Sequence, residues 1–298
     1  LFFTRKGRCY WLKCYEIPEG DKNFKGRAIQ NMLNIEPDDS VNALLRLRGL
    51  NDEEFVKSHY VVFATKNGTV KKTSLEAYSR PRTNGVNAIN IVEGDEVVDV
   101  RLTNGKNEII LANRNGRAVR FDEDSIRTMG RVSTGVRGMK LDDGDDQVVG
   151  MIVVNNAETE TVMVVSENGY GKRSQVEDYR KTNRGGKGVK TFSITEKTGR
   201  LVAIKNVTDD NDLMIINKSG IAIRLAVSEC RVMGRATQGV RLINLSKKND
   251  VIASVCKVMS TEKEAEVSGD KDDENATPAT DVQATEAPQT ETQTTETE

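Results

Sequence analysis

The sequence contains few of the residues from which catalytic and metal sites are built. Its 298 residues include one histidine, one tryptophan, four cysteines and five prolines, and aromatic side chains make up 5% of the chain. A single histidine and scattered cysteines exclude the usual clustered ligands of a zinc site, and no Gly-Lys-Ser/Thr phosphate loop occurs. We therefore expect no catalytic residue, no metal and no cofactor in this chain.

Long apolar segments are also missing. No run approaches the roughly 18 apolar residues that cross a membrane, and neither a cleavable signal nor a disulfide framework is apparent. These absences predict a cytoplasmic protein with no membrane partner. The chain opens with Leu1-Phe2-Phe3 rather than with Met, and this opening is typical of a strand. We therefore expect the chain to be a piece of a longer protein.

Charge is divided unevenly along the chain. Residues 261–298 contain twelve acidic residues and two lysines, whereas the whole chain carries a net charge of −1. The same stretch has almost no large apolar residue, so burial cannot offset the entropy of ordering it. We expect a folded domain over residues 1–258 and a disordered acidic tail over residues 259–298. Such a tail either competes with a polyanion for the basic domain or keeps the chain soluble.

A repeat of about 50 residues sets the expected architecture. In each copy an apolar run leads into a turn that ends in glycine, and the next run begins with a basic residue. Asn-Gly between two apolar runs is a strong hairpin signal, because both central residues of a type I′ turn have positive φ. The five expected hairpins are Leu1 to Lys13 around Lys6-Gly7, Tyr60 to Lys72 around Asn67-Gly68, Ile109 to Phe121 around Asn115-Gly116, Val162 to Arg173 around Asn168-Gly169, and Leu213 to Leu225 around Ser219-Gly220.

A second glycine follows each turn glycine after 17 or 19 residues, at Gly26, Gly85, Gly135, Gly188 and Gly239. Further short apolar stretches come after it, so each unit holds about four strands, and long helical periodicity is nearly absent. Units of four antiparallel strands at this period predict an all-β, propeller-like ring of blades. The Trp-Asp endings of WD40 repeats and the paired glycines of kelch repeats do not occur.

Basic residues recur at two places in every repeat, just past the turn glycine and in the irregular connection before the second glycine. Equivalent residues of a repeated unit occupy equivalent positions on a ring, so we expect a continuous positive rim that binds a polyanion. The alternative is that exposed Lys and Arg keep edge strands soluble and unpaired. The same connection is basic each time while acidic residues gather in other turns, which favours binding. The candidate contacts are Lys71, Lys72, Arg80, Arg82, Arg117, Arg120, Arg131, Lys172, Arg173, Arg184, Gly185, Gly186, Lys187, Gly188, Arg224 and Arg235.

The composition also indicates which polyanion to expect. Proteins that bind single strands interleave stacking aromatics with their basic residues, and here the few aromatics lie mainly in strands. No helix is apparent that would enter the major groove, so we expect duplex DNA held through its backbone. Bending a stiff duplex costs several kcal/mol, so the phosphate contacts must be spread along an arc, as a ring of repeats allows.

The densest motif is Thr182-Asn183-Arg184-Gly185-Gly186-Lys187-Gly188 in the fourth repeat. Glycines let the main chain approach a phosphate closely, exposed amides can form an anion-binding nest, and Arg184 and Lys187 supply charge. The alternative is a flexible solvent loop.

The repeats and this motif resemble a known family. Together with the phrases Asn67-Gly68-Thr69-Val70-Lys71-Lys72-Thr73 and Gly169-Tyr170-Gly171-Lys172-Arg173 and the acidic tail, they are similar to the C-terminal domains of bacterial DNA gyrase A proteins over about residues 1–258. The resemblance implies a β-pinwheel, a six-bladed relative of the propeller, whose positive rim wraps duplex DNA. It implies that a chromosome-associated holoenzyme, built from two A and two B gyrase proteins, introduces negative supercoils with ATP and Mg²⁺ used elsewhere. The family's DNA-cleaving tyrosine lies in its N-terminal region, so no tyrosine here takes that role.

One motif departs from the family pattern. The family's defining box, Gln-Arg-Arg-Gly-Gly-Lys-Gly, lies in its first blade, whereas the first repeat here resembles the second blade. The stretch Arg184 to Gly188 resembles a later, partly preserved copy with Thr182-Asn183 in place of Gln-Arg. We expect the first blade to have been lost with a missing N-terminal part. Two alternative functions stay open, the related C-terminal domain of the topoisomerase IV A protein and a non-catalytic propeller scaffold that binds acidic proteins.

Overall fold

The computed structural model describes residues 1–20, 25–47, 49–142, 144–245 and 250–260, and residues 1–260 form one compact unit. Apart from Met259 and Ser260, the expected acidic tail of residues 259–298 lies outside the described residues.

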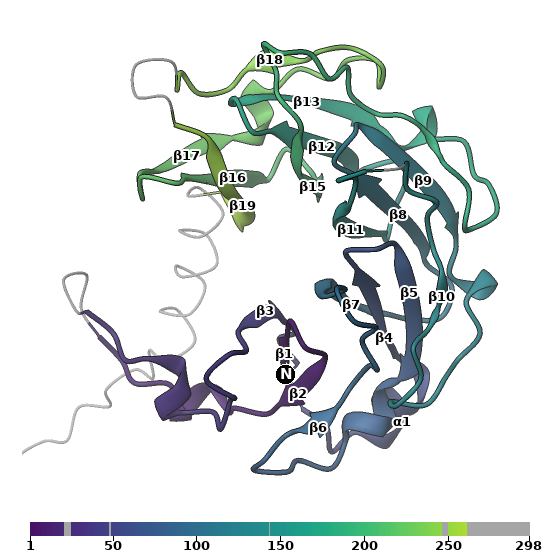
Figure 1. Cartoon of the computed structure of the whole chain (residues 1–298), viewed down its shortest axis with the longest axis vertical. Helices are drawn as coiled ribbons and strands as arrows, with labels where there is room; N and C mark the ends of the chain where they lie inside the picture. Colours follow the sequence, from purple (N-terminus) through teal and green to yellow (C-terminus); the bar gives the residue numbers. More distant parts are fainter. Residues whose placement is uncertain (21–24, 48, 143, 246–249, 261–298) are drawn as a thin grey trace, which may run out of the picture. The chain divides into compact units, whose positions relative to one another are not determined.

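Nearly all regular structure in the described residues is antiparallel sheet, in a five-bladed, propeller-like arrangement (Figure 1). Four sheets have four strands and the fifth has three. From the inner to the outer strand, the sheets are β3 (Val41–Leu44), β1 (Phe2–Thr4), β2 (Arg8–Tyr10) and β6 (Val86–Asn87); β7 (Val97–Thr103), β4 (Tyr60–Thr65), β5 (Thr69–Ser74) and β10 (Val136–Arg137); β11 (Val148–Val154), β8 (Glu108–Asn113), β9 (Arg117–Asp122) and β14 (Val189–Lys190); β15 (Leu201–Val207), β12 (Thr161–Ser166), β13 (Tyr170–Gln175) and β18 (Val240–Arg241); and β19 (Ile252–Met259), β16 (Asn211–Asn217) and β17 (Ala222–Ala226).

Within the described ranges helical structure is confined to short segments, which confirms the all-β prediction. One α-helix, α1 (Glu53–Ser58), starts where the Asp52 carboxylate accepts a hydrogen bond from the amide of Phe55. The 3₁₀ turns are η1 (Cys14–Glu16), η2 (Ile29–Asn31), η3 (Leu75–Tyr78), η4 (Glu123–Ser125), η5 (Val176–Asp178) and η6 (Val227–Glu229). Turns η3 to η6 follow the second strand of successive hairpins, so they recur in the repeat.

The five expected hairpins form, but their turns differ from the expected type. In the first turn the amide of Gly7 donates to Thr4 O, and the other turn glycines make the equivalent bond. Glycine is thus the fourth residue of the turn and not one of its two central residues. With φ of +85° for Gly7 and Gly68, this is the three-residue hairpin loop in which a left-handed glycine follows the turn.

The outer strand of each four-stranded sheet comes from the following repeat. β6 lies beyond the second hairpin in the sequence, yet it pairs with β2 of the first, and β10, β14 and β18 repeat this exchange. Each exchanged strand starts at the second glycine, and a Cβ there would collide with a carbonyl oxygen of the preceding sheet, such as Val70 O at Gly135. The prediction of four strands per unit is therefore right in number, but one strand serves the neighbouring sheet.

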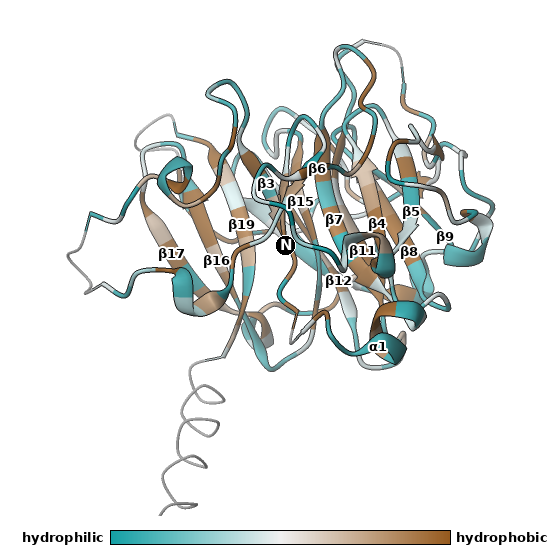
Figure 2. Ribbon diagram, turned by 90° about the horizontal axis from the view of Figure 1, so that it is seen from below, coloured by the Kyte–Doolittle hydropathy of each residue, from teal (hydrophilic) through white to brown (hydrophobic). Residues whose placement is uncertain are grey.

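Buried apolar residues of successive sheets pack against one another. Figure 2 shows hydrophobic residues, in brown, along the strands of these sheets. In the first of these cores the Phe3 ring packs edge-on against Phe63, with centroids 5.2 Å apart, and against Tyr78 at 5.8 Å. The inner strands contact their neighbours in the order β3, β7, β11, β15 and β19. This packing leaves the hairpin ends and the outer strands free to carry charge.

Candidate nucleic-acid interface

The candidate cations just past the turn glycines lie on the second strand of each hairpin, and most of them are buried. Lys71, Lys72, Lys172 and Arg173 are at most 6% exposed, and the Arg120 side chain is 11% exposed. Their charged groups face protein oxygens. This corrects the expectation that these five residues form part of an exposed rim.

Part of this burial follows from a hydrogen bond that recurs in the repeat. The side chain four positions after the turn glycine donates this bond to the following repeat. Each acceptor is a main-chain carbonyl in or beside η3 to η6. Glu123 O, Val176 O and Val227 O also accept the closing amide of their own 3₁₀ turn, so the side chain is a second donor to these oxygens. The bonds are Trp11 Nε1 to Tyr78 O at 2.9 Å, Lys72 Nζ to Glu123 O at 3.2 Å, Arg120 Nη1 to Val176 O at 2.9 Å and Tyr179 O at 3.1 Å, and Arg173 Nη1 to Val227 O at 3.1 Å. These side chains therefore join neighbouring repeats.

Carboxylates complete three of these junctions, since Arg173 Nη1 also lies 2.7 Å from the exposed Asp209 carboxylate. Glu123 is fully buried, and its Oε1 lies 3.7 Å from Lys72 Nζ. Glu108 receives Arg120 at 2.5 Å and Lys181 at 2.6 Å. Burial alone would raise the pKa of Glu108, but hydrogen bonds from Lys181 and Arg120 bring this pKa below its ordinary value. Glu123 in η4 and Glu108 on β8 thus neutralise the side chains of Lys72 and Arg120.

The cations of the irregular connections lie at the surface, as expected. Arg80, Arg82 and Lys187 are exposed, and Arg131, Arg184 and Arg235 are partly exposed. The Arg184 guanidinium donates from Nε to Ser125 O at 2.9 Å and from Nη1 to Arg137 O at 3.0 Å. Arg235 Nη1 donates in the same way to Lys190 O at 2.6 Å. These arginines brace the connection against the preceding outer strand while part of each side chain stays accessible.

Two further candidates lie on strands and are already paired. Arg117 Nη1 donates to Gly188 O at 3.4 Å. Arg224 is exposed, and it donates from Nε to the Asp212 carboxylate and from Nη2 to Met259 O, each at 2.7 Å. Both side chains therefore reach the surface with polar groups that protein oxygens already engage.

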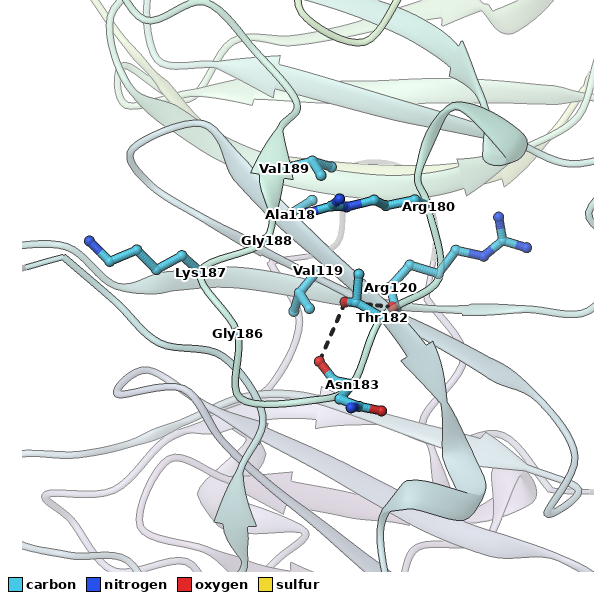
Figure 3. Close-up of a pocket in the computed structure, with 10 residues that line it drawn as sticks. All are labelled: Ala118, Val119, Arg120, Arg180, Thr182, Asn183, Gly186, Lys187, Gly188 and Val189. Carbon is cyan, nitrogen blue, oxygen red and sulfur yellow. Dashed lines mark hydrogen bonds between the residues drawn. The ribbon is translucent and has the colours of Figure 1, made fainter.

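The glycine-rich motif borders a hollow of about 290 Å³ between β9 and the connection (Figure 3). Its amides are only partly free, because the amide of Gly185 donates to Gly138 O at 2.6 Å. Lys187 points away from the hollow and pairs with the partly exposed Asp142 at 2.8 Å. Arg180 extends across the hollow (Figure 3). The motif is therefore a braced turn with a cation on each side, and not an open nest of amides.

Sequence reasoning missed the cations of the outer strands themselves. Arg137, Lys190 and Arg241 are exposed and stand two residues after the second glycine of their repeats. That constant spacing was the signal that could have found them. We call the accessible set the outer rim, which comprises Arg80, Arg82, Arg127, Arg131, Arg137, Arg180, Arg184, Lys187, Lys190, Arg231, Arg235 and Arg241.

The described residues contain no group of three or more His, Cys, Asp or Glu side chains that could hold a metal ion, and none of their helices is long and apolar enough to span a membrane. His59 Nδ1 lies 3.0 Å from Ser58 Oγ and 2.9 Å from Phe55 O at the end of α1.

Comparison with protein families matches every repeat. The model described as DNA gyrase C-terminal domain, beta-propeller, matches residues 1–48, 59–104, 107–155, 160–208 and 211–256. The DNA gyrase A protein of Staphylococcus epidermidis is 45% identical over 258 residues, which are 87% of this chain and 28% of that protein. The corresponding protein of Staphylococcus aureus is 44% identical over the same shares. The chain thus spans little more than a quarter of these relatives.

Solved structures with a similar fold include two from topoisomerases. The crystal structure of the C-terminal domain of DNA topoisomerase IV superposes with a TM-score of 0.79 at 26% identity, covering 92% of this chain and 83% of the other. A DNA gyrase A C-terminal domain superposes with a TM-score of 0.74 at 24% identity, covering 87% and 81%, and this second likeness concerns the fold.

Proposed function

The chain belongs to the DNA gyrase C-terminal domain family, and from that premise we propose that it binds duplex DNA along the outer rim and wraps it. The observation that carries the proposal is the recurrence of accessible cations at equivalent positions of successive sheets, such as Arg137, Lys190 and Arg241. Neutralising phosphates with such cations releases condensed counterions, and the sequence of the DNA hardly matters.

The arrangement along an arc supports wrapping as well as binding. Bending 20 to 30 base pairs by 40 to 90° costs on the order of 1–6 kcal/mol. Contacts must therefore continue along the bent path if they are to offset that cost. Three of the four exchanged strands, β10, β14 and β18, each place one cation along this path, which spreads the contacts as wrapping requires.

In the whole protein we propose the role that the family implies. The chain would act within a holoenzyme of gyrase A and gyrase B proteins in the cytoplasm, bound to the chromosome. The wrapped segment would be delivered to a cleavage core outside this chain, with ATP and Mg²⁺ used there. This chain would supply binding and bending and no covalent step.

The test is to ligate nicked circular DNA in the presence of the purified chain and to measure the change in linking number. Right-handed wrapping gives a positive change that grows with protein concentration. Alanine variants of Arg137, Lys190 and Arg241 should reduce it, whereas alanine at Lys57 and Lys106, exposed lysines outside the rim, should not. Absence of any change at saturating protein would refute wrapping.

The likeness to the topoisomerase IV domain favours a second candidate function, that of a basic clamp that binds DNA without wrapping it. Salt titration separates both from a scaffold for acidic proteins. DNA binding by the rim falls linearly with the logarithm of salt concentration and strengthens with duplex length, whereas a protein docking site has no reason to prefer long duplex. Strong salt-dependent binding without a linking-number change would favour the clamp.

A further inference from the structure

Two lysine ammonium groups are buried without a carboxylate partner. Lys71 is fully buried, and its Nζ donates to Ala88 O and to Arg131 O, each at 2.5 Å. Lys172 is 1% exposed, and its Nζ donates to Gly234 O at 2.7 Å. Neither ammonium forms an ion pair in the part of the chain that the structure describes. Both lysines stand three residues after a turn glycine, so they occupy equivalent positions of two repeats.

Burying these charges costs stability. Desolvation lowers the pKa of Lys71 to about 7 and that of Lys172 to about 8. An apolar side chain could fill the same space at no such cost, since an unpaired charge in an apolar site is strongly disfavoured. A contribution to folding therefore does not explain why an ammonium occupies either position.

The acceptors of these bonds indicate another role. Arg131 belongs to the outer rim, and Gly234 directly precedes Arg235 of the same rim. We propose that Lys71 and Lys172 are positioning residues, each fixing the main chain of a connection so that its rim arginine meets the DNA backbone. The proposal rests on the proposed function.

The repeat between them supplies an internal comparison. Val119 occupies the equivalent position there, beside the hollow that borders the glycine-rich motif. That connection is held instead by Arg184, through its bonds to Ser125 O and Arg137 O. The connection over residues 127–135 is thus held by Lys71, and the one over residues 231–239 by Lys172 together with Arg235. The connection over residues 180–188 is held by Arg184 without a buried lysine.

A change in the protonation state of Lys71 or Lys172 should affect only the connection that this lysine holds. The Arg131 guanidinium lowers the pKa of Lys71 further, and its neighbours Cys9 and Tyr78 stay neutral because burial raises their pKa values. Around Lys172, Asp178 raises the pKa while Arg235 and Lys190 lower it, and burial keeps Tyr179 neutral. Because hydrogen bonds from a charged donor are about twice as strong as neutral ones, deprotonation should loosen the two connections.

Global stability should change in the opposite direction. The folded pKa lies below the ordinary value of 10.5, so between pH 7 and pH 10 the unfolded chain binds more protons than the folded chain. The contribution of Lys71 to stability is therefore least favourable below pH 7 and rises with pH. Loosening of the connection together with a gain in stability distinguishes a positioning residue from a structural one.

The experiment compares Lys71→Met with Val119→Met, a matched apolar change at the equivalent position, in the full chain at pH 6. For Lys71→Met we expect amide exchange over residues 127–135 to rise about tenfold, as for loss of a bond to a charged group. Exchange over residues 180–188 should not rise, and the stability in urea should not fall. The affinity for a long duplex should drop several-fold. Val119→Met should leave exchange over residues 127–135 and DNA affinity unchanged.

Several outcomes would overturn the proposal. Unchanged exchange over residues 127–135, or unchanged DNA affinity of the folded variant, would show that Lys71 does not position the rim. Failure of the wild-type chain to bind duplex DNA would instead refute the proposed function. The exchange measurement would still show whether Lys71 fixes the main chain of residues 127–135. If Lys71→Met does not fold, Lys172→Met with exchange measured over residues 231–239 makes the same test.

Discussion

Replacing Lys72 with Met should unfold the junction between two repeats without weakening DNA binding by the folded chain. The Lys72 side chain is 7% exposed and its partner Glu123 is fully buried. After the change the Glu123 carboxylate keeps only neutral donors, Thr103 Oγ1 at 2.6 Å and the amide of Asn107 at 3.3 Å. A buried charge left without its partner costs about 3–5 kcal/mol.

For a domain of this size that loss corresponds to a melting temperature lower by roughly 6–20 °C. Thermal and urea unfolding of the variant measure the loss. The double variant Lys72→Met with Glu123→Gln removes the unpaired charge and should recover a large part of the stability. The folded variant should bind duplex DNA with the salt slope of the wild-type chain, because the ammonium never reaches solvent.

Two results would refute this reasoning. A loss below about 1 kcal/mol, the range of exposed ion pairs, would mean that the pair is solvated and not buried. A salt slope lowered by about 0.9, the change expected for one phosphate contact, would mean that Lys72 does reach the DNA.

Three further changes test other parts of the structure. Gly188→Ala should destabilise the chain by about 1–3 kcal/mol in urea unfolding, because φ is +73° and a Cβ would collide with a carbonyl of β9. Gly186→Ala should be nearly neutral in the same assay, because a Cβ there meets nothing closer than 3.8 Å. Alanine at the three cations of β10, β14 and β18 should lower the salt slope of DNA binding by up to about 2.7, and an unchanged slope would exclude them from the interface. Burial raises the pKa of Cys9 to about 12, so at pH 8 a thiol reagent should modify the exposed Cys14 and Cys256 quickly and the other two thiols only after unfolding. Four rapidly reacting thiols would contradict this packing.

The sequence predicted the hairpins because their signals are local. A turn glycine between two apolar runs needs no information from distant residues, and all five hairpins form where they were expected. The exchange of β6, β10, β14 and β18 could not be read in the same way. A short run such as Val86–Asn87 pairs equally well with its own hairpin or with the preceding one, and only the packing of a glycine against the neighbouring sheet decides between them.

The candidate site was predicted in part for the same reason. Basic residues in the irregular connections lie at the surface, as chain segments between elements usually do. For Lys72, Arg120 and Arg173 the environment is set by 3₁₀ turns about 50 residues away, whose carbonyls accept from these side chains. Lys and Arg are almost never fully buried unless paired, and a single sequence does not show that those partners exist. Arg137, Lys190 and Arg241 were missed because they lie beyond the second glycine, in segments assigned to apolar strands.

The exchanged outer strand also determines how the number of blades in such a protein can change. A hairpin, its outward strand and its inner strand are contiguous in sequence, but the outward strand completes the sheet that came before. Duplicating one stretch of about 50 residues therefore inserts a blade that supplies an edge to its predecessor and receives one from its successor. No half-finished sheet arises inside the array. The number of blades, and with it the length of the outer rim, can thus change by whole steps through simple gene duplication.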